Sequence, residues 1–170
     1  MLKSSIVAAL VFAATGASAA TATSNLSVTA TVAANCTIST APVAFGSAYD
    51  TVAGTAVNAT GTVTIACTKN ATSTISLGLG ANASGSTRRM KDAGTTFLSY
   101  ELYQQPTTVP GTACNYTGAQ IWGTVGAAIY TPAAAPSTTA RAYNVCGQIT
   151  GGQDVPAATY SDTVLATVTF

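Results

Sequence analysis

The strongest constraint on the fold is the alternation of short β-forming runs with turn residues along most of the chain. Threonine, valine, isoleucine and tyrosine gather in the runs, and glycine, proline, asparagine and serine separate them. Residues 61 to 68 read GTVTIACT, so a strand there places Val63, Ile65 and Cys67 on one face. Helix signals are scarce after the first 20 residues. The pattern predicts an all-β sandwich or barrel.

Other runs carry the same signal. Residues 97 to 103 read FLSYELY and place Leu98, Tyr100 and Leu102 on one face. Further strands are predicted over residues 74–79, 140–149 and 160–170, the last of which ends the printed sequence. Predicted loops span residues 80–87, 106–111 and 131–139, and two prolines in the last of these argue against a central strand. The large side chains expected in the core are Phe45, Tyr100, Trp122 and Tyr143.

The first 19 residues have the features of a secretory signal peptide. Lys3 supplies a basic start, residues 6 to 14 are apolar, and Ala17-Ser18-Ala19 matches the small-residue cleavage pattern. The apolar run is shorter than the roughly 20 residues that a membrane-spanning helix needs. We therefore predict an exported chain whose mature form begins near Ala20.

Removal of Lys3 with this peptide leaves no net charge. Six Lys and Arg minus one gives five, against five Asp and Glu. A chain with so few charges has no basic patch for nucleic acid or for anionic lipid. It also has no histidine, which removes the commonest general base and the Ser-His and Cys-His pairs. A glycosidase-type carboxylate pair would have to be assembled from five scattered acids. We predict a protein that is not an enzyme, with no catalytic residue, no cofactor, no metal and no small-molecule substrate.

Four cysteines follow the predicted signal peptide, at Cys36, Cys67, Cys114 and Cys146. In an exported chain an even number of cysteines indicates disulfides, and four allow three pairings. The preferred pairing joins Cys36 to Cys67 and Cys114 to Cys146. Each closed loop could then contribute roughly 3–4 kcal/mol to stability. A four-thiolate metal site is the alternative, although the spacing includes no C-x-x-C pair.

Residues 25 to 34, which we call the arm, read NLSVTATVAA and contain no charge, proline or glycine. An extended conformation would place five small or apolar side chains on one face: Leu26, Val28, Ala30, Val32 and Ala34. One interpretation is an ordinary first strand that pairs within its own domain. The other is a strand that leaves the domain, because such an unprotected edge is a feature that monomers usually avoid.

Two smaller features have alternative interpretations. Arg88, Arg89 and Lys91 form a local basic cluster, which predicts either a solvated loop or a contact with a neighbouring subunit. Trp122 is expected in the core or along a groove, the alternative being a surface that stacks on sugars.

The mature chain resembles the spore coat protein U-like subunits of archaic, Csu-type chaperone–usher pili. The resemblance rests on the order of several motifs. They are the Thr/Val/Ala arm leading to Asn35-Cys36-Thr37-Ile38, then Ala44-Phe45-Gly46, residues 61–68, Arg89-Met90 before Leu98-Ser99-Tyr100, Trp122-Gly123, Tyr143 ahead of Gly147-Gln148-Ile149, and residues 158–170. Cys36 and Cys67 match the family's expected pair, whereas Cys114 and Cys146 look additional, which leaves their pairing open.

The resemblance implies an incomplete immunoglobulin-like β-sandwich, the pilin fold, completed by a donor strand from a neighbouring subunit. It implies three segments: a signal peptide at 1–19, a donor strand at 20–35 and a pilin domain at 36–170. The arm residues on one face would fill a groove bordered by a C-terminal strand with Val164, Ala166, Val168 and Phe170. The implied partners are identical or related subunits, a periplasmic chaperone and an outer-membrane usher.

The implied function is a shaft subunit of a cell-surface pilus that supports adhesion and biofilm formation. The alternatives are a minor or adaptor subunit, a carbohydrate-binding adhesive subunit, and a structural protein of a spore coat. A head-to-tail contact that does not close produces an open filament, which suits the first of these.

Overall fold

The computed structural model describes Gly16, residues 19 to 47 and residues 49 to 170, and it divides into residues 1–31 and residues 32–170. The predicted signal peptide therefore lies outside the described residues, apart from Gly16 and Ala19. Within the described part, the regular elements are β1 (Cys36–Ala41), β2 (Val57–Cys67), β3 (Thr74–Leu77), β4 (Arg88–Lys91), β5 (Phe97–Gln104), the 3₁₀ helix η1 (Gly126–Ala128), β6 (Arg141–Ile149) and β7 (Ala166–Thr169). None of the described helical segments is long and apolar enough to cross a membrane.

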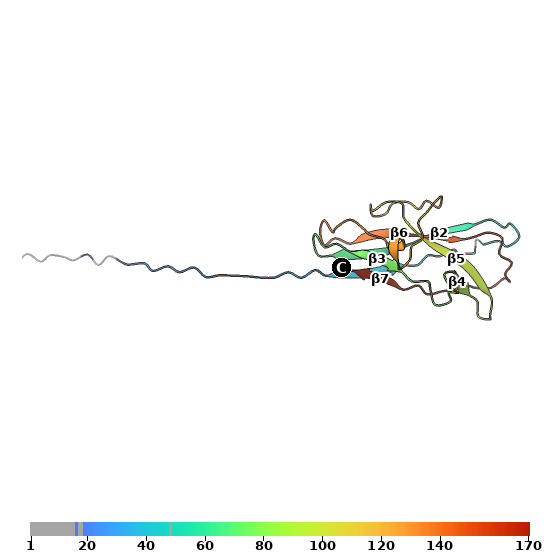
Figure 1. Ribbon diagram of the computed structural model, residues 1–170, viewed down its shortest axis with the longest axis horizontal. Helices are drawn as coiled ribbons and strands as arrows, with labels where there is room; N and C mark the ends of the chain where they lie inside the picture. Colours follow the sequence, from blue (N-terminus) through green and yellow to red (C-terminus); the bar gives the residue numbers. More distant parts are fainter. Residues whose placement is uncertain (1–15, 17–18, 48) are drawn as a thin grey trace, which may run out of the picture. The chain divides into compact units, whose positions relative to one another are not determined.

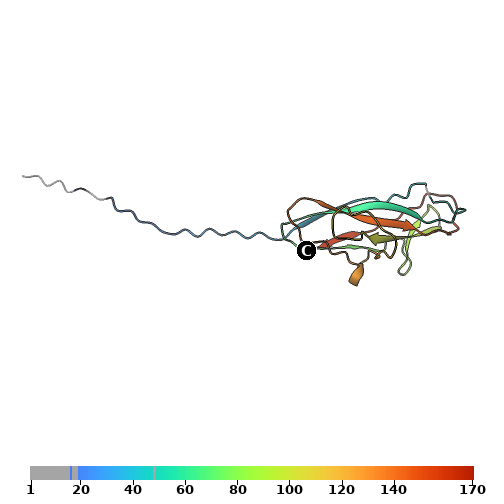
Figure 2. The same cartoon turned by 90° about the horizontal axis from the view of Figure 1, so that it is seen from above.

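The strands of the second unit form two antiparallel sheets (Figures 1 and 2). The larger sheet has the order β1-β2-β6-β5-β4, and the smaller sheet pairs β3 with β7. Strand β5 serves two neighbours, because residues 97 to 100 pair with β4 and residues 101 to 104 pair with β6. The large sheet curls as a result. Since the regular elements of the described residues are strands apart from one short 3₁₀ helix, the all-β prediction is confirmed.

The core lies between the two sheets and follows the predicted alternation. On β2 the buried side chains are Val63, Ile65 and Cys67, and on β5 they are Leu98, Tyr100 and Leu102. Strand pleating turns alternate residues toward the opposite sheet, so these positions bury together. Tyr143 on β6 is also fully buried, whereas Phe45 is only half-buried.

Trp122 is completely buried, and its indole N–H donates a hydrogen bond of 2.9 Å to the carbonyl of Ile75. Its ring centroid lies 5.0 Å from that of Tyr130, within the range of aromatic contact. The core interpretation of Trp122 is correct, and the sugar-stacking alternative is wrong for this side chain.

Three strands depart from the prediction. β1 and β4 lie in segments for which no strand was predicted, one rich in Thr and Ser and the other rich in charge. The predicted strand at 160–170 is reduced to β7, residues 166–169. Its first part turns to the other sheet, where Ser161 and Lys91 exchange two backbone hydrogen bonds of 2.9 and 3.0 Å.

The prediction of a solvated basic loop is wrong for Arg88. This side chain is fully buried and forms an ion pair with Glu101. Its guanidinium also donates hydrogen bonds to three carbonyl groups, those of Leu77 at 3.2 Å, Gly78 at 2.8 Å and Trp122 at 2.6 Å. A buried cation is stable only when its donors are satisfied. Arg88 therefore joins both sheets, whereas Arg89 lies over the ring of Phe97, 4.0 Å from its centroid.

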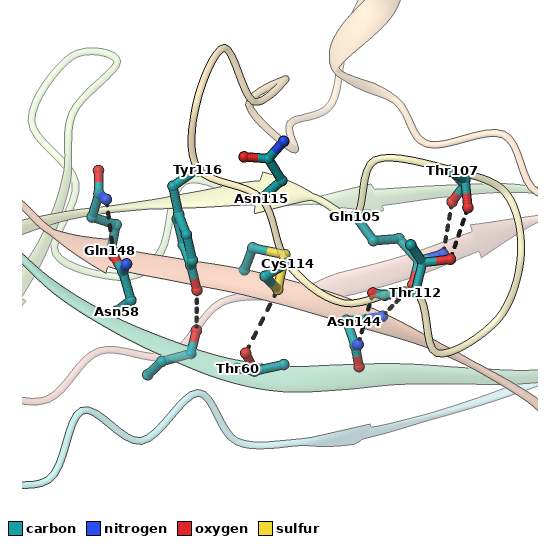
Figure 3. Close-up of a disulfide and its surroundings, with 12 residues drawn as sticks. Asn58, Thr60, Gln105, Thr107, Thr112, Cys114, Asn115, Tyr116, Asn144 and Gln148 are labelled. Carbon is teal, nitrogen blue, oxygen red and sulfur yellow. Dashed lines mark hydrogen bonds between the residues drawn. A yellow bond between two sulfur atoms is a disulfide. The ribbon is translucent and has the colours of Figure 1, made fainter.

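Two disulfides join Cys36 to Cys67 and Cys114 to Cys146, the pairing that the sequence analysis preferred. No thiolate remains for the alternative metal site, because all four cysteines are bonded. Figure 3 shows the second disulfide among polar contacts that fasten the long segment between β5 and β6 onto the sheet. Tyr116 donates to the carbonyl of Ala59 at 3.2 Å, and Asn144 donates to the carbonyl of Thr112 at 2.9 Å.

Candidate assembly cleft

The two sheets each end in a strand whose outer edge has no partner in the part of the chain that the structure describes. β1 pairs only with β2, and β7 pairs only with β3. The two strands nevertheless lie beside each other. β7 ends near the start of β1 (Figures 1 and 2), so they run in opposite directions. A strand edge with free backbone groups is a template for an additional strand.

A cleft opens where the end of β1 and the start of β7 lie, and we call it the β1–β7 cleft. Its deeper part has a volume of about 320 Å³ and reaches the core residues Val63, Leu77, Leu102 and Val145. A second hollow of about 610 Å³ adjoins it and shares Thr40, Val164 and Ala166 with it. The cleft thus lies beside residues 38–41 of β1 and beside residues 160–166, which lead into β7.

A third hollow, of about 780 Å³, extends the cleft beyond the end of β1. It shares Val43, Phe45, Met90 and Tyr160 with the deeper part. The half-buried state of Phe45 follows from this position, since its ring borders the opening rather than the closed core.

One carboxylate lies in the wall of the cleft, and it is fully engaged. Asp162 accepts a hydrogen bond of 2.7 Å from the hydroxyl of Tyr100. Its other oxygen accepts two bonds of 3.1 Å from the backbone and side-chain N–H groups of Asn82. The backbone of Gly80 passes so close that a Cβ would lie 1.9 Å from this carboxylate, and its φ of +93° also requires glycine.

Two tyrosines near the core have raised pKa values. For Tyr100 the main cause is burial, and the hydrogen bond that it donates to the Asp162 carboxylate raises the pKa further above its usual value. Burial raises the pKa of Tyr130 to about 12, although the hydrogen bond from Gln105 acts in the opposite direction. Both hydroxyls therefore hold their protons more strongly in the folded protein than in the unfolded chain.

This difference predicts a loss of stability in alkali. Above about pH 10 the unfolded chain loses its tyrosine protons first, so the stabilisation present below that pH declines toward pH 12. We expect the melting temperature to fall between about pH 10 and about pH 12, while tyrosinate absorbance shows some of the tyrosines titrating late. Tyr100→Phe should reduce the dependence on pH. Uniform titration of all tyrosines near pH 10 with constant stability would contradict the prediction.

Of the C-terminal residues predicted to border a groove, Val164 precedes β7, Ala166 and Val168 belong to it, and Phe170 follows it. Val164 and Ala166 line the cleft, and Val168 is half-buried against the core. Phe170 follows the strand and is 53% exposed. Leu165, between the first two, faces outward and is 74% exposed.

The residues predicted to form the donor strand are exposed and belong to no strand in this structure. Residues 19 to 35 carry no strand or helix assignment. Leu26, Val28 and Val32 are 82–87% exposed, and Ala30 and Ala34 are exposed as well. Three large apolar side chains on one face of an uncharged segment are thus open to solvent.

Several cleft residues were not predicted from the sequence. Ile38 and Thr40 belong to β1, whose short Thr- and Ser-rich sequence hides the alternation. Gly78 and Gly80 border the second hollow, and the repeated glycines of LGLG were the available signal for a close backbone approach. Among the described residues, no group of three or more His, Cys, Asp or Glu is placed to hold a metal ion.

Comparison with known proteins gives matches of three kinds, to a family, to a relative and to solved structures. The family model of the Spore Coat Protein U domain matches residues 22–167. Protein U of Myxococcus xanthus is 37% identical to this chain, over 91% of this chain and 88% of that protein. These two matches cover nearly all of the chain beyond its predicted signal peptide.

Among solved structures, one match is a chain in the crystal structure of the CsuC–CsuE complex of a chaperone with a tip adhesion subunit, from the archaic chaperone–usher Csu pili of Acinetobacter baumannii. The TM-score is 0.56 at 24% identity, and the match covers 82% of this chain but only 41% of the other. The likeness supports the immunoglobulin-like pilin fold for the two-sheet arrangement described above.

Proposed function

This chain belongs to the Spore Coat Protein U domain family, and we propose that it is a structural shaft subunit of a cell-surface pilus that polymerises by donor-strand exchange. The observation that carries the proposal is the β1–β7 cleft, an opening with an apolar floor beside two strands whose outer edges have no partner in the described part of the chain. The arm supplies the matching element, an uncharged segment with period-two alternation. In the polymer, the arm of one subunit fills the cleft of the next.

The energetics favour this exchange. Full burial of a leucine or valine side chain contributes roughly 1.5–3 kcal/mol. Leu26, Val28 and Val32 are all exposed and could each contribute an amount of this order on entering a cleft. The backbone of the arm would add hydrogen bonds to a free strand edge. Each subunit donates one surface and accepts at another, so the contact repeats without closing and forms a filament.

The proposal assigns segments and partners to the chain. Residues 1–19 are the signal peptide, residues 20–35 the donor strand and residues 36–170 the pilin domain. An exported subunit with an open apolar cleft needs protection before assembly, which a periplasmic chaperone and an outer-membrane usher would provide. The finished pilus lies outside the cell, where it supports adhesion and biofilm formation, and the subunit itself catalyses no reaction.

A structural role in a spore coat is the second candidate, because the matching family is described by that term. Both roles are structural and both could use the same exchange. Surface pili that disappear when the gene is deleted would support the first candidate, and loss from the spore layer alone would support the second.

The test uses a peptide that copies residues 25–34 and the mature chain diluted until it is monomeric. We expect the peptide to fill the cleft and to raise the melting temperature by several degrees, because about 1 kcal/mol shifts the melting temperature of a domain of this size by roughly 2–8 °C. A peptide with aspartate in place of Val28 is the control and should have little effect. Equal melting temperatures with and without the unmodified peptide would argue for a domain that is complete by itself.

A further inference from the structure

Thr68, directly after β2, holds the backbone that leads into β1. Its N–H donates to the carbonyl of Asn35 at 2.8 Å, and its hydroxyl accepts from the N–H of Asn35 at 3.0 Å. The same hydroxyl lies 3.4 Å from the carbonyl oxygen of Ala33 and 3.3 Å from that of Asn35, so it also donates in this direction. We call these contacts the Thr68 clamp. They continue the β1–β2 ladder one pair beyond Cys36 and Cys67.

The hydroxyl takes a position that a backbone carbonyl fills in a regular antiparallel pair. The carbonyl of Thr68 instead accepts a hydrogen bond of 3.0 Å from the N–H of Ala71. That turn contains Asn70, which has a positive φ of 65°. Because the chain turns away here, only a side chain with both donor and acceptor capacity extends the ladder toward Ala33. The adjacent Cys36–Cys67 disulfide fastens the previous pair.

We propose that the Thr68 clamp keeps the arm from entering the cleft of its own subunit, so that the cleft is reserved for the arm of a second copy. This inference rests on the proposed donor-strand exchange. It concerns whether the cleft of a subunit is filled by that subunit's own arm or by the arm of a neighbouring copy. To lie along the free edge of β1 in the same subunit, residues 25–31 would have to reverse direction within residues 32–35 and form a hairpin with β1.

The local sequence and the clamp both oppose such a reversal. Tight hairpin turns need positive φ angles and favour Asn-Gly or Asp-Gly. Residues 32–35 read VAAN and contain no glycine. The clamp holds Ala33 and Asn35 in the extended direction of β1, and a hairpin would break its hydrogen bonds. Thr68 is thus a positioning residue for assembly, without contact to the cleft itself.

A contact that keeps the arm out of its own cleft would favour polymerisation. Two segments joined by a short linker meet at an effective concentration on the order of mM. Separate subunits at about μM concentration would lose this competition by roughly a thousandfold if both reactions had the same affinity. An arm with free choice would therefore close its own cleft and end polymerisation. Making the intramolecular path geometrically unfavourable restores the advantage of a neighbouring copy.

The test compares Thr68→Val with Thr68→Ser in the mature full chain. Valine keeps the shape but removes the hydroxyl, and serine keeps the hydroxyl. Each chain is unfolded in denaturant with its disulfides intact and refolded over a range of concentrations. Size-exclusion chromatography then measures the ratio of heat-resistant monomer to polymer. For Thr68→Val we expect this ratio to rise about tenfold or more and to become independent of concentration, as for an intramolecular reaction.

The matched control is Thr37→Val. Thr37 is another threonine of the same ladder, and its hydroxyl donates to the carbonyl of Ala66 at 3.4 Å. This variant and Thr68→Ser should both refold like the wild type. Should Thr68→Val fail to fold, the double variant Ala33→Asn with Ala34→Gly provides a second route, because it supplies a hairpin turn beside an intact Thr68. This second variant is expected to raise the monomer ratio as well.

The outcomes separate the two proposals. If the arm peptide stabilises the monomer but neither variant changes the ratio of monomer to polymer, the clamp proposal is overturned and donor-strand exchange stands. If the peptide has no effect on the monomer, both proposals are overturned. A higher monomer ratio in Thr37→Val equal to that in Thr68→Val would also overturn the clamp, since any weakening of the ladder would then suffice.

Discussion

Replacement of Val28 by aspartate is expected to leave a folded subunit that no longer extends a fibre. Val28 lies in the middle of the alternating face of the arm, so donor-strand exchange would carry its side chain into the β1–β7 cleft. The floor of that cleft is apolar, with Val63, Leu77 and Val145 among its residues. A carboxylate buried there without a partner costs several kcal/mol. The nearby Asp162 carboxylate is already satisfied by Tyr100 and Asn82 and would repel a second negative charge.

The measurement is the fraction of polymer formed by purified mature chains, observed by size-exclusion chromatography and electron microscopy. We expect a decrease of about 100-fold or more, which corresponds to about 3 kcal/mol. Thr29→Asp is the matched control, because it adds the same charge one residue away on the opposite face of the arm. It should polymerise nearly as well as the wild type. Equal fibres from Val28→Asp and the wild type would sink the assignment of the arm.

The second large effect concerns Arg88 and the stability of the domain. Arg88→Met is expected to lower the free energy of unfolding by about 3–5 kcal/mol, the range for breaking a buried ion pair from one side. The variant leaves the Glu101 carboxylate, only 20% exposed, without its cation. It also removes the hydrogen bonds to the carbonyls of Leu77, Gly78 and Trp122. Since Leu77 and Gly78 border the cleft, assembly should weaken together with stability.

Urea unfolding of the oxidised mature chain measures this change. Arg89→Met is the control, because Arg89 belongs to the same strand but is only half-buried. It makes one hydrogen bond of 3.1 Å, to the carbonyl of Asn82, besides its contact over Phe97. Its effect should be about 1 kcal/mol or less. A double variant, Arg88→Met with Glu101→Gln, should recover part of the loss, because no unpaired charge then remains near the core. Similar stabilities for Arg88→Met and Arg89→Met would show that Arg88 has no structural role of its own.

The sequence predicted the strands and buried faces that depend on the alternation of neighbouring residues. Alternation in residues 61–68 and 97–103 predicted the strands that became β2 and β5 and the faces that they bury. A pleated strand sends alternate residues to opposite sides whatever its neighbours are, so this information is present in the chain itself. The same reasoning identified the apolar face of the arm.

The sequence was misleading where burial depends on distant residues. Three basic residues within residues 88–91 indicate a solvated segment, because lysine and arginine are rarely buried without a partner. Arg88 is buried because the fold brings to it a carboxylate from β5 and carbonyls from two other segments. The residues around Arg88 in the sequence do not indicate these distant partners. The hydroxyl of Thr68 is a similar case, since its role follows from the turn that occupies its own carbonyl.

The amino-acid sequence by itself determined the all-β class, the alternating face of the arm and the cysteines available for two disulfides. These features depend on the nature and spacing of neighbouring residues. The tertiary structure alone decided that β1 and β7 end their sheets side by side and leave the β1–β7 cleft between them. The physical reason is that strand order is set by contacts between residues far apart in the chain. Whether a strand has a free edge depends on which other strands pair beside it, and the sequence of one segment does not contain that information.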